Sequence, residues 1–510
     1  MSQSATTILQ LLDAGAPDAI AINTPGGTPL GYRALRELAN QTVAELNARG
    51  IGNNDRVAIV LDNGPEMAAA FLCVAAGATA APLNPAYRAD EFEFYLSDLR
   101  AKVLLIERDK SSPAVEIAIK LGVPIVRLAA RPEKGAGSFV LEFPDSLSRT
   151  KASRPGPAAT EDVALVLHTS GTTSRPKIVP LAHRNVCASA RNIRATLALT
   201  PTDRGLNIMP LFHIHGLIAG TLAPLSAGSQ VSYTTGFNAL KFFSWMTEVR
   251  PTWYTAVPTM HQTILSRAGK NMDVIKANPL RFIRSSSSSL PPQVIKELED
   301  VFDTPVIESY GMTEAAHQMS SNPLPPGTRK PGTVGLAAGP EVAVIDDDAN
   351  PVAFGATGEI AIRGENVTSG YENNPKANAE AFTKGWFRTG DQGLMDAEGY
   401  LTITGRLKEI INRGGEKISP REVDEILLDH PAVQQCVTFA FPHDKLGEDV
   451  AAAVVLREGA QADEKALRTF VATRLTDFKV PRKILILAEI PKGATGKVQR
   501  IGLAKKLGLV

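Results

Sequence analysis

Short apolar runs alternate with longer amphipathic segments along the chain up to about residue 339. The segments between the runs have the apolar spacing or the length of helices, as at residues 32–50 and 65–76. Regular alternation of strands and helices predicts parallel α/β layers. A stretch rich in glycine, proline, serine and charge, residues 131–157, is expected to be a loop. The runs of strand length lie at residues 56–61, 103–106, 163–168, 206–209, 253–257 and 282–285.

The pattern changes after residue 339. Short alternating strands separated by glycine and aspartate turns indicate an antiparallel or barrel-like subdomain over about residues 340–405. Beyond it, a helix at 420–428, strands near Val437 and at 451–456, and a helix at 464–474 indicate α+β structure. We therefore expect an α/β protein with a large N-terminal domain, residues 1–407, of stacked mixed sheets with helices. A small α+β domain, residues 408–510, follows a hinge at residues 406–408.

Composition narrows the class of protein. The chain has 510 residues, 44% of them hydrophobic and 21% charged, which is ordinary for a globular protein of two to four domains. A net charge of +1 provides no field that would attract nucleic acid. The three cysteines are widely spaced, which argues against a disulfide framework and suits a reducing cytoplasm. Neither a signal peptide nor a transmembrane anchor is expected.

A hydroxyl-rich segment follows the strand predicted at residues 163–168. Residues 169–173 all carry a hydroxyl or are glycine, and Lys177 follows four residues later. Such a turn presents N–H and O–H donors, and the lysine adds positive charge, which together suit a polyphosphate. The same residues are also compatible with an ordinary surface turn. The P-loop spacing is absent, because a single glycine, Gly171, precedes the lysine and Ile178 follows it.

Two further segments could contact a nucleotide. In residues 307–314, Tyr310 could stack on a base, while Thr313 and Glu314 could reach phosphate and a divalent cation. The alternative is a solvated glutamate at a loop end. Further along, Asp391 could accept hydrogen bonds from ribose hydroxyls, or it could simply occupy a β-turn.

Two glycine-containing segments lie nearer the C-terminus. Residues 405–420 mix charge with a Gly414–Gly415 turn, and Arg406 lies close to that turn. A linker explains the glycines but not the arginine. Lys497 lies on a glycine-flanked loop, where a mobile lysine could approach developing negative charge. A solvated basic tail is the alternative.

In this order, these segments resemble the acyl-adenylate-forming superfamily, which includes acyl-CoA synthetases, adenylation domains of peptide synthetases and firefly-type luciferases. The resemblance covers nearly the whole chain. It implies ATP, Mg²⁺ and CoA as cofactor and co-substrates. It also implies an acid–CoA ligase that first forms an acyl-adenylate and then a thioester, with a mobile C-terminal lid that alternates between the two half-reactions.

The resemblance assigns roles to matching positions. The phosphate loop corresponds to Thr169, Ser170, Gly171, Thr172, Thr173 and Lys177. The adenine segment corresponds to Glu308, Ser309, Tyr310, Gly311, Met312 and Thr313. The remaining nucleotide and metal positions are Glu314 for Mg²⁺, Asp391 and Arg406 for ribose, and Lys497 for the acyl carboxylate and α-phosphate. The implied catalytic set is Lys497, Glu314, Thr169 and Lys177.

The resemblance also marks the moving parts and one departure. Lys408 corresponds to the hinge, and Gly414 and Gly415 to the loop that enters the site for thioester formation with CoA. Ile178 stands where the family usually has glycine. If that glycine serves a positive φ, a β-branched residue would strain the turn.

The acid pocket is expected to be small and polar. His213 corresponds to the family's gate beside the acyl and pantetheine sites, and a run of serines lies at residues 285–289. The proposed lining is His213, Ser287, Ser288, Ser289 and His317. A fatty acyl chain would leave such donors unpaired, at about 1–3 kcal/mol each, whereas a second carboxylate would satisfy them. A tight serine turn and a capped helix histidine are the structural alternatives.

A closer resemblance, to the oxalyl-CoA synthetases of plants and fungi, rests on residues 167–177, 253–259, 281–285 and 319–325. It favours oxalate as the acid. Malonate, 4-coumarate or a medium-chain fatty acid remain alternatives, as do a carrier-protein ligase and a luciferase-like adenylating oxygenase. The expected state is a monomer or homodimer whose partners are small molecules.

Overall fold

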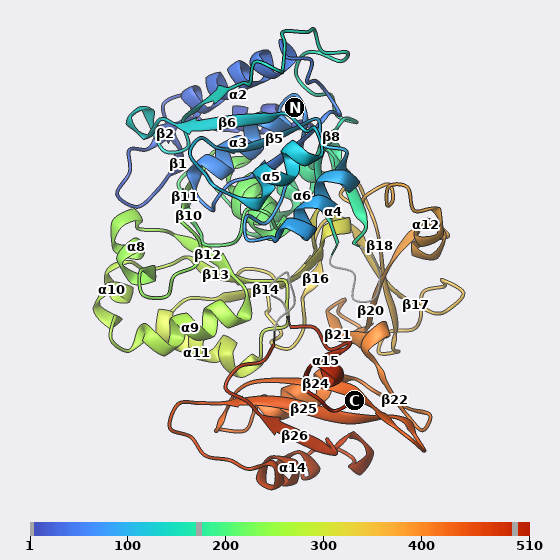
Figure 1. Cartoon of the computed structure of the whole chain (residues 1–510). Coiled ribbons are helices and arrows are strands. Elements are labelled where there is room, and N and C mark those ends of the chain that lie inside the picture. The colour runs from blue at the N-terminus through green and yellow to red at the C-terminus, as the bar shows by residue number, and fades with distance from the viewer. Residues whose placement is uncertain (1–4, 170–175, 492–497) are drawn as a thin grey trace. The chain divides into compact units, whose positions relative to one another are not determined.

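The computed structural model describes residues 5–169, 176–491 and 498–510, which belong to two compact units (Figure 1). The larger unit comprises residues 1–169, 177–341 and 363–378. The smaller unit comprises residues 170–176, 342–362 and 379–510. Residues 342–362 and 379–407, expected in the N-terminal domain, thus group with the C-terminal residues, and the domain boundary drawn at residue 407 stays a prediction.

The larger unit contains a seven-stranded sheet in the order β7-β6-β5-β3-β4-β8-β9. Its five inner strands are joined by parallel pairings, and the two edge strands pair antiparallel. The strands are β3 (Arg56–Val60), β4 (Thr79–Pro82), β5 (Val103–Glu107), β6 (Ile125–Ala130), β7 (Phe139–Glu142), β8 (Val163–His168) and β9 (Ile178–Ala182). The inner strands are apolar on both faces, as expected for a buried parallel sheet.

Strand β7 corrects the expectation that residues 131–157 form only a loop. It is four residues long and pairs with β6. A strand this short, set among glycine and proline, gives too few alternations to be recognised in the sequence. The helices of this part are α1 (Ile8–Leu11), η1 (Leu12–Ala14), α2 (Tyr32–Asn47), α3 (Pro65–Ala75), α4 (Ala89–Leu99), α5 (Pro113–Lys120) and η2 (Pro132–Lys134).

A nine-stranded sheet in the order β16-β15-β14-β13-β12-β10-β11-β1-β2 completes the larger unit. The strands from β1 to β14 in this order are parallel, and β2, β15 and β16 are antiparallel additions. The bounds are β1 (Ile20–Asn23), β2 (Leu30–Gly31), β10 (Arg204–Asn207), β11 (Gln230–Tyr233), β12 (Trp253–Ala256), β13 (Phe282–Ser285), β14 (Val306–Met312), β15 (His317–Ser321) and β16 (Leu336–Ala337).

Helices cover this second sheet and bury its apolar side chains. Helix α11 illustrates why, since Val294, Ile295, Leu298 and Phe302 recur at helical spacing and join the core beneath β12 and β13. The helices are α6 (His183–Thr196), α7 (Ala223–Leu225), α8 (Phe242–Val249), α9 (Pro258–Ala268), α10 (Met272–Ala277), α11 (Pro292–Phe302), the 3₁₀ turn η4 (Thr313–Ala315) and η3 (His215–Leu222), which has the wide π-type turn.

The smaller unit contains a five-stranded sheet in which β20 pairs antiparallel with β18, β19 and β21. Of the two expectations for residues 340–405, the antiparallel sheet is therefore present as an open sheet in the described residues. The bounds are β17 (Glu341–Ile345), β18 (Gly358–Arg363), β19 (Phe382–Thr383), β20 (Trp386–Met395) and β21 (Leu401–Arg406). Helix α12 (Pro375–Ala381) precedes β19.

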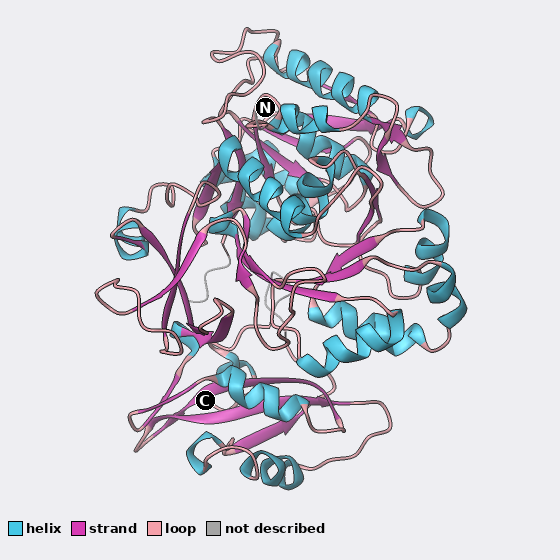
Figure 2. Ribbon diagram, turned by 180° about the vertical axis from the view of Figure 1, so that it is seen from behind, coloured by secondary structure: helices cyan, strands magenta, loops and turns pink. Residues whose placement is uncertain are grey.

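The C-terminal residues form an α+β layer with helices on both faces of a sheet (Figure 2). Alternation along β25 explains this: Val450 and Ala452 pack with α13 and α14, whereas Ala451 and Ala453 pack with α15. The elements are η5 (Leu407–Glu409), β22 (Ile411–Arg413), β23 (Glu416–Ile418), α13 (Pro420–Leu428), β24 (Val433–His443), β25 (Gly447–Leu456), α14 (Glu464–Ala472), η6 (Asp477–Lys479), β26 (Lys483–Ile486) and α15 (Leu503–Lys506).

Among the described residues, we find no helix whose length and apolar character would let it cross a membrane.

Candidate active site

The carboxyl ends of strands β10, β12, β13 and β14 point to the same edge of the nine-stranded sheet, because these strands are parallel. The segments that leave this edge begin at Ile208, Val257 and Ser286. Two of them contain residues predicted for the acid pocket. Ligands of open α/β sheets bind outside the carboxyl ends of the strands. The larger unit therefore presents its candidate site at this edge.

The two ends of the predicted phosphate loop, Thr169 and Lys177, are held together by hydrogen bonds. The Thr169 N–H donates to the carbonyl of Lys177 at 3.0 Å, and the Lys177 N–H donates to Thr169 Oγ1 at 3.3 Å. The intervening candidates Ser170, Gly171, Thr172 and Thr173 lie outside the described residues, as does Lys497.

Ile178 is not strained. It is the first residue of β9, pairs with His168 across the hairpin, and is 5% exposed within the core of the seven-stranded sheet. Its φ does not lie in the left-handed region. A β-branched side chain suits an extended, buried strand position. The expected strain is therefore wrong, because the chain has already returned to a strand at this residue.

Lys177 and Glu314 are connected through a residue that the sequence analysis missed. The Lys177 ammonium lies 4.0 Å from the centroid of the Tyr371 ring. The Tyr371 hydroxyl donates to Glu314 Oε1 at 2.8 Å. Burial, followed by the Glu314 carboxylate, raises the pKa of Tyr371, so the phenol keeps its proton and acts as a donor. Nothing in the local sequence marked Tyr371, because its partners are distant in the chain.

Glu314 fits a cation that also binds substrate phosphates. Its side chain is 6% exposed, with Oε1 already held by Tyr371. In the part of the chain that the structure describes, no group of three or more His, Cys, Asp or Glu could hold a metal ion. Mg²⁺ is commonly bound by one or two carboxylates together with nucleotide phosphates. A single carboxylate suits that arrangement, whereas it would not retain a resident metal.

The residues predicted to bind adenine also stabilise the carboxyl edge of the nine-stranded sheet. The buried Glu308 Oε1 accepts from the Leu290 N–H at 2.9 Å, which fastens the turn after β13 to β14. Tyr310 is 9% exposed. A Cβ on Gly311 would lie 1.8 Å from the carbonyl oxygen of His317, so glycine lets β15 fold back against β14. The other predicted members of the segment, Ser309, Met312 and Thr313, adjoin these positions, with Ser309 buried and the other two half-buried.

The predicted acid-pocket residues are only partly brought together. Ser287 and Ser288 are exposed and Ser289 is half-buried. His317 is buried, and its ring stacks on that of His215 at 4.8 Å. His213 is half-buried, with its ring against Phe212 at 4.6 Å.

His215 contacts the serine run. Its Nδ1 lies 3.0 Å from Ser287 Oγ, and it is the first residue of the π-type helix η3. Sequence reasoning selected His213 from the same motif and missed His215. The doubled histidine in residues 213–215 was the available signal. Arg284, which contacts His215 from the interior, was also missed.

In the smaller unit, Asp391 and Arg406 face each other across strands β20 and β21, with Arg406 Nε 2.9 Å from Asp391 Oδ1. Asp391 is 6% exposed. Lys408 is exposed in η5. Gly414 and Gly415 form the two-residue turn between β22 and β23, with φ of 60° and 101°. A turn with positive φ at both positions favours glycine.

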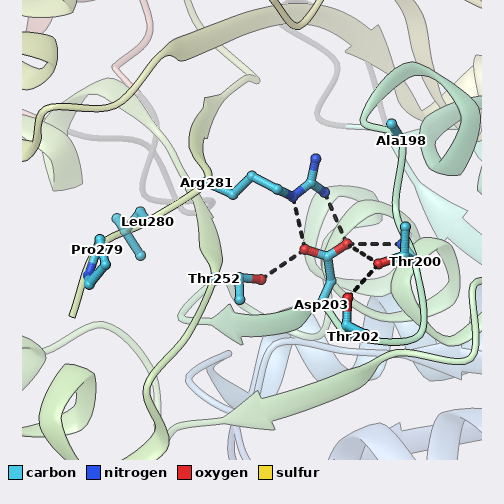
Figure 3. A pocket seen from close by; sticks show the side chains of 8 residues that line it. All are labelled: Ala198, Thr200, Thr202, Asp203, Thr252, Pro279, Leu280 and Arg281. Carbon is cyan, nitrogen blue, oxygen red and sulfur yellow. Dashed lines mark hydrogen bonds and ion pairs between the residues drawn. The ribbon is translucent and has the colours of Figure 1, made fainter.

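A cavity of about 390 Å³ lies at the opposite, amino-terminal edge of the nine-stranded sheet (Figure 3). Asp203 accepts from Arg281 at 3.0 Å, from the Thr200 N–H at 2.9 Å and from Thr252 Oγ1 at 2.9 Å. The polar groups that line this cavity therefore form hydrogen bonds with one another, and we assign the cavity no ligand.

Two family models match the chain. Residues 12–372 match the family described as AMP-binding enzyme, and residues 422–497 match the AMP-binding enzyme C-terminal domain. An oxalate–CoA ligase of Arabidopsis thaliana is 46% identical over 489 residues, 95% of each chain. An oxalate–CoA ligase of Saccharomyces cerevisiae is 45% identical over 88% of this chain and 86% of its own. The crystal structure of ATP-bound MatB from Rhodopseudomonas palustris superimposes with a TM-score of 0.87 at 29% identity, covering 98% of both chains.

Proposed function

Since the chain belongs to the AMP-binding enzyme family, we propose that it is an ATP-dependent acid–CoA ligase that converts oxalate to oxalyl-CoA. The observation that carries the choice of acid is the polar cluster at the carboxyl edge of the sheet, where Ser287, His215 and His317 lie together. Two relatives that are 45% and 46% identical act on oxalate by name, which supports the same choice.

The reaction has two steps. One oxalate carboxylate attacks the α-phosphorus of ATP, and pyrophosphate leaves to give oxalyl-adenylate. The CoA thiolate then attacks the activated carbonyl carbon, and AMP leaves. The first step brings two anions together, so charge neutralisation and positioning supply most of the catalysis. No protein nucleophile is required.

The chain's residues take the following roles in this proposal. Thr169 and Lys177, with the loop between them, bind the β- and γ-phosphates, and Lys177 offsets their charge. Glu314, oriented by Tyr371, binds Mg²⁺. Mg²⁺ supplies positive charge to the phosphate oxygens. Asp391, oriented by its ion pair with Arg406, accepts from the ribose hydroxyls.

In this proposal, residues of the C-terminal part divide the two half-reactions. We propose that Lys497 neutralises the acyl carboxylate and α-phosphate during adenylation. Residues 408–510 then rotate about Lys408, which withdraws Lys497 and brings the Gly414–Gly415 turn to the CoA channel beside His213. The two positive φ values of this turn support a tight, exposed loop that can approach a ligand closely.

Replacing Lys497 tests this division. Lys497→Ala should lower the rate of adenylation by about 100-fold or more, because an uncompensated charge is left in the transition state. Thioester formation from supplied oxalyl-adenylate should change by less than about threefold. Pyrophosphate release measures the first step, and CoA-thioester formation measures the second. Similar losses in both steps would contradict the assignment.

A substrate screen tests the choice of acid. Pyrophosphate release with ATP, Mg²⁺ and CoA should be fastest with oxalate when malonate, 4-coumarate and octanoate are compared at equal concentration. Rapid turnover of octanoate without turnover of oxalate would overturn the proposal. Oxygen uptake or light emission after adenylation would instead indicate the luciferase-like alternative.

The expected cytoplasmic location and the state of monomer or homodimer stay predictions. Cys73, Cys187 and Cys436 are free thiols, which supports a reducing compartment. Burial raises the pKa of Cys73 and of Cys187 to about 12, so both remain unreactive thiols.

A further inference from the structure

Behind the candidate acid site lies a positive charge that no negative charge of the described residues balances. Arg284 is the third residue of β13 and is 0% exposed. Within the ranges that the structure describes, it forms no ion pair, and its Nε has no hydrogen-bond partner. Buried charges are normally paired, because removing an ion from water costs several kcal/mol. An unbalanced guanidinium at this depth therefore calls for a functional reason.

Among the described residues, Arg284 contacts an imidazole nitrogen, a hydroxyl oxygen and an amide oxygen, and no carboxylate. Nη1 lies 3.3 Å from His215 Nε2 and 3.4 Å from Thr255 Oγ1. Nη2 donates to Gln318 Oε1 at 3.3 Å. The Gln318 amide is fixed in this orientation, because its Nε2 donates to Thr196 Oγ1 at 3.1 Å. These polar groups form hydrogen bonds with the guanidinium but carry no negative charge, so its positive charge is not neutralised.

The guanidinium sets the proton position on His215. A guanidinium can only donate, so His215 Nε2, which also lies 2.6 Å from Thr255 Oγ1, is an acceptor. The ring proton is then on Nδ1 and is donated to Ser287 Oγ at 3.0 Å. Ser287 is exposed and has a φ of 73°, an uncommon conformation for serine. The hydroxyl hydrogen of Ser287 is thereby available to a ligand oxygen at the site.

The arrangement forms a relay of donors from the interior to the site. Hydrogen bonds in a chain polarise one another, and a charge in a dry region acts over a longer distance than in water. Burial lowers the pKa of Arg284 to about 9, which still leaves it protonated at neutral pH. The field of Arg284 thus reaches the serine run through His215, although its own atoms do not touch the surface.

We infer that Arg284 is a specificity-determining positioning residue, whose unbalanced charge, relayed through His215 and Ser287, selects acids that carry a second negative group. The inference rests on the proposed function and identifies what recognises the distal carboxylate. A monocarboxylic acid leaves the charge unbalanced, whereas a dianion balances it on binding. The residue acts on the distal end of the acid and not on the carboxylate that is adenylated.

The test compares two acids that differ only in this group. Oxamate carries a neutral amide where oxalate carries its second carboxylate, so the ratio of kcat/KM for oxalate over oxamate isolates the distal charge. Arg284→Met should lower this ratio at least about tenfold, mainly through KM for oxalate. Arg284→Lys, which keeps the charge, should retain most of the ratio. If Arg284→Met lowers both acids equally, the inference is wrong.

Arg281→Met is a matched control. Arg281 immediately precedes β13 and pairs with the buried Asp203. It therefore lies at the opposite, amino-terminal edge of the sheet. Its replacement should leave the oxalate-to-oxamate ratio unchanged while lowering Tm, because Asp203 loses its partner. Arg284→Met should leave Tm unchanged or raise it, because an unbalanced buried charge is removed. A loss of Tm without a change in the ratio would assign Arg284 a structural role and overturn the inference.

The outcome separates this inference from the proposed function. If the wild-type protein prefers malonate to oxalate, the proposed acid fails, and malonate with its monoamide becomes the pair that tests Arg284 by the same ratio. If the wild-type protein prefers a monocarboxylic acid, both proposals are overturned. If it prefers oxalate but Arg284→Met keeps the wild-type ratio, the inference about Arg284 alone fails.

Discussion

At the residue scale, Tyr371 joins two groups of opposite charge. Tyr371→Phe removes the donor to Glu314 Oε1 while keeping the ring beside Lys177. A hydrogen bond to a charged group contributes about 1.5–3 kcal/mol, so adenylation should slow by about tenfold or more. The Mg²⁺ concentration for half-maximal rate should rise, because the carboxylate is less well oriented. Pyrophosphate release over a Mg²⁺ titration measures both effects.

The ring of Tyr371 has a separable role. Tyr371→Leu also removes the aromatic face beside Lys177, so KM for ATP should rise beyond its value in Tyr371→Phe. An unchanged Mg²⁺ requirement in both variants would show that Tyr371 does not orient Glu314.

Site residues could be proposed from the sequence where the local pattern carried the chemistry. The hydroxyl-rich loop with Lys177, and the carboxylate Glu314 after a strand, are visible as short patterns. Tyr371 and Arg284 were not, because their significance depends on partners 57 and 69 positions away, Glu314 and His215. A sequence pattern gives no account of which distant polar groups the packing brings together.

At the element scale, the C-terminal tail is fastened to the rest of the smaller unit by Arg500. Its Nη2 lies 2.6 Å from Asp424 Oδ2 on α13, and its Nε lies 3.1 Å from Glu409 Oε2 in η5. Arg500→Met would leave Asp424 buried without its cation, which should lower the free energy of unfolding of this unit by about 3–5 kcal/mol. Hydrogen exchange resolved by peptide should show faster exchange in α13 and β24.

Helix α13 also provides the control for this pair. Arg421 and Glu425 form an i,i+4 ion pair whose carboxylate is 46% exposed. Arg421→Met should lower the free energy of unfolding by less than about 1 kcal/mol, because solvent screens the pair. Equal effects of the two substitutions would contradict a special role for Arg500.

Elements were predictable where burial imposes a simple period. Strands β8 and β13 and helix α13 have the bounds that the apolar pattern predicted, because each has one consistent environment along its length. Strand β7 and the order of strands within the sheets were not predicted. The order of strands in a sheet depends on where the chain crosses over between consecutive strands. Hydrophobic spacing along the sequence contains no information on that choice.

At the scale of the whole molecule, the apolar pattern correctly indicated an α/β part followed by a β-rich part and an α+β part. The sequence placed the β-rich part in the N-terminal domain, whereas residues 342–362 and 379–407 group with the C-terminal residues. The boundary near residue 407 was drawn where the pattern of apolar residues changes, and the hydrophobic pattern of a segment does not record which unit it packs with. That boundary stays a prediction.

The larger unit buries neutral histidines, which makes its stability depend on pH. Burial lowers the pKa of His183 to about 4 and that of His261 to about 3. Both Nδ1 atoms are engaged, His183 by the Ile8 N–H at 3.1 Å and His261 by the Tyr254 hydroxyl at 3.2 Å. Between pH 6.5 and 4 the unfolded chain binds protons that the folded chain does not, so stability falls as pH falls.

Urea unfolding of the larger unit measures this loss. Between pH 7.5 and 4.5, each of these two histidines should lower the free energy of unfolding by about 2 kcal/mol or more, because the folded pKa values lie below the whole interval. His261→Phe removes one titrating group and keeps an aromatic ring in the core, so its stability should fall less steeply with pH, although it is lower at pH 7.5. A slope equal to that of the wild-type protein would show that His261 is not buried in its neutral form.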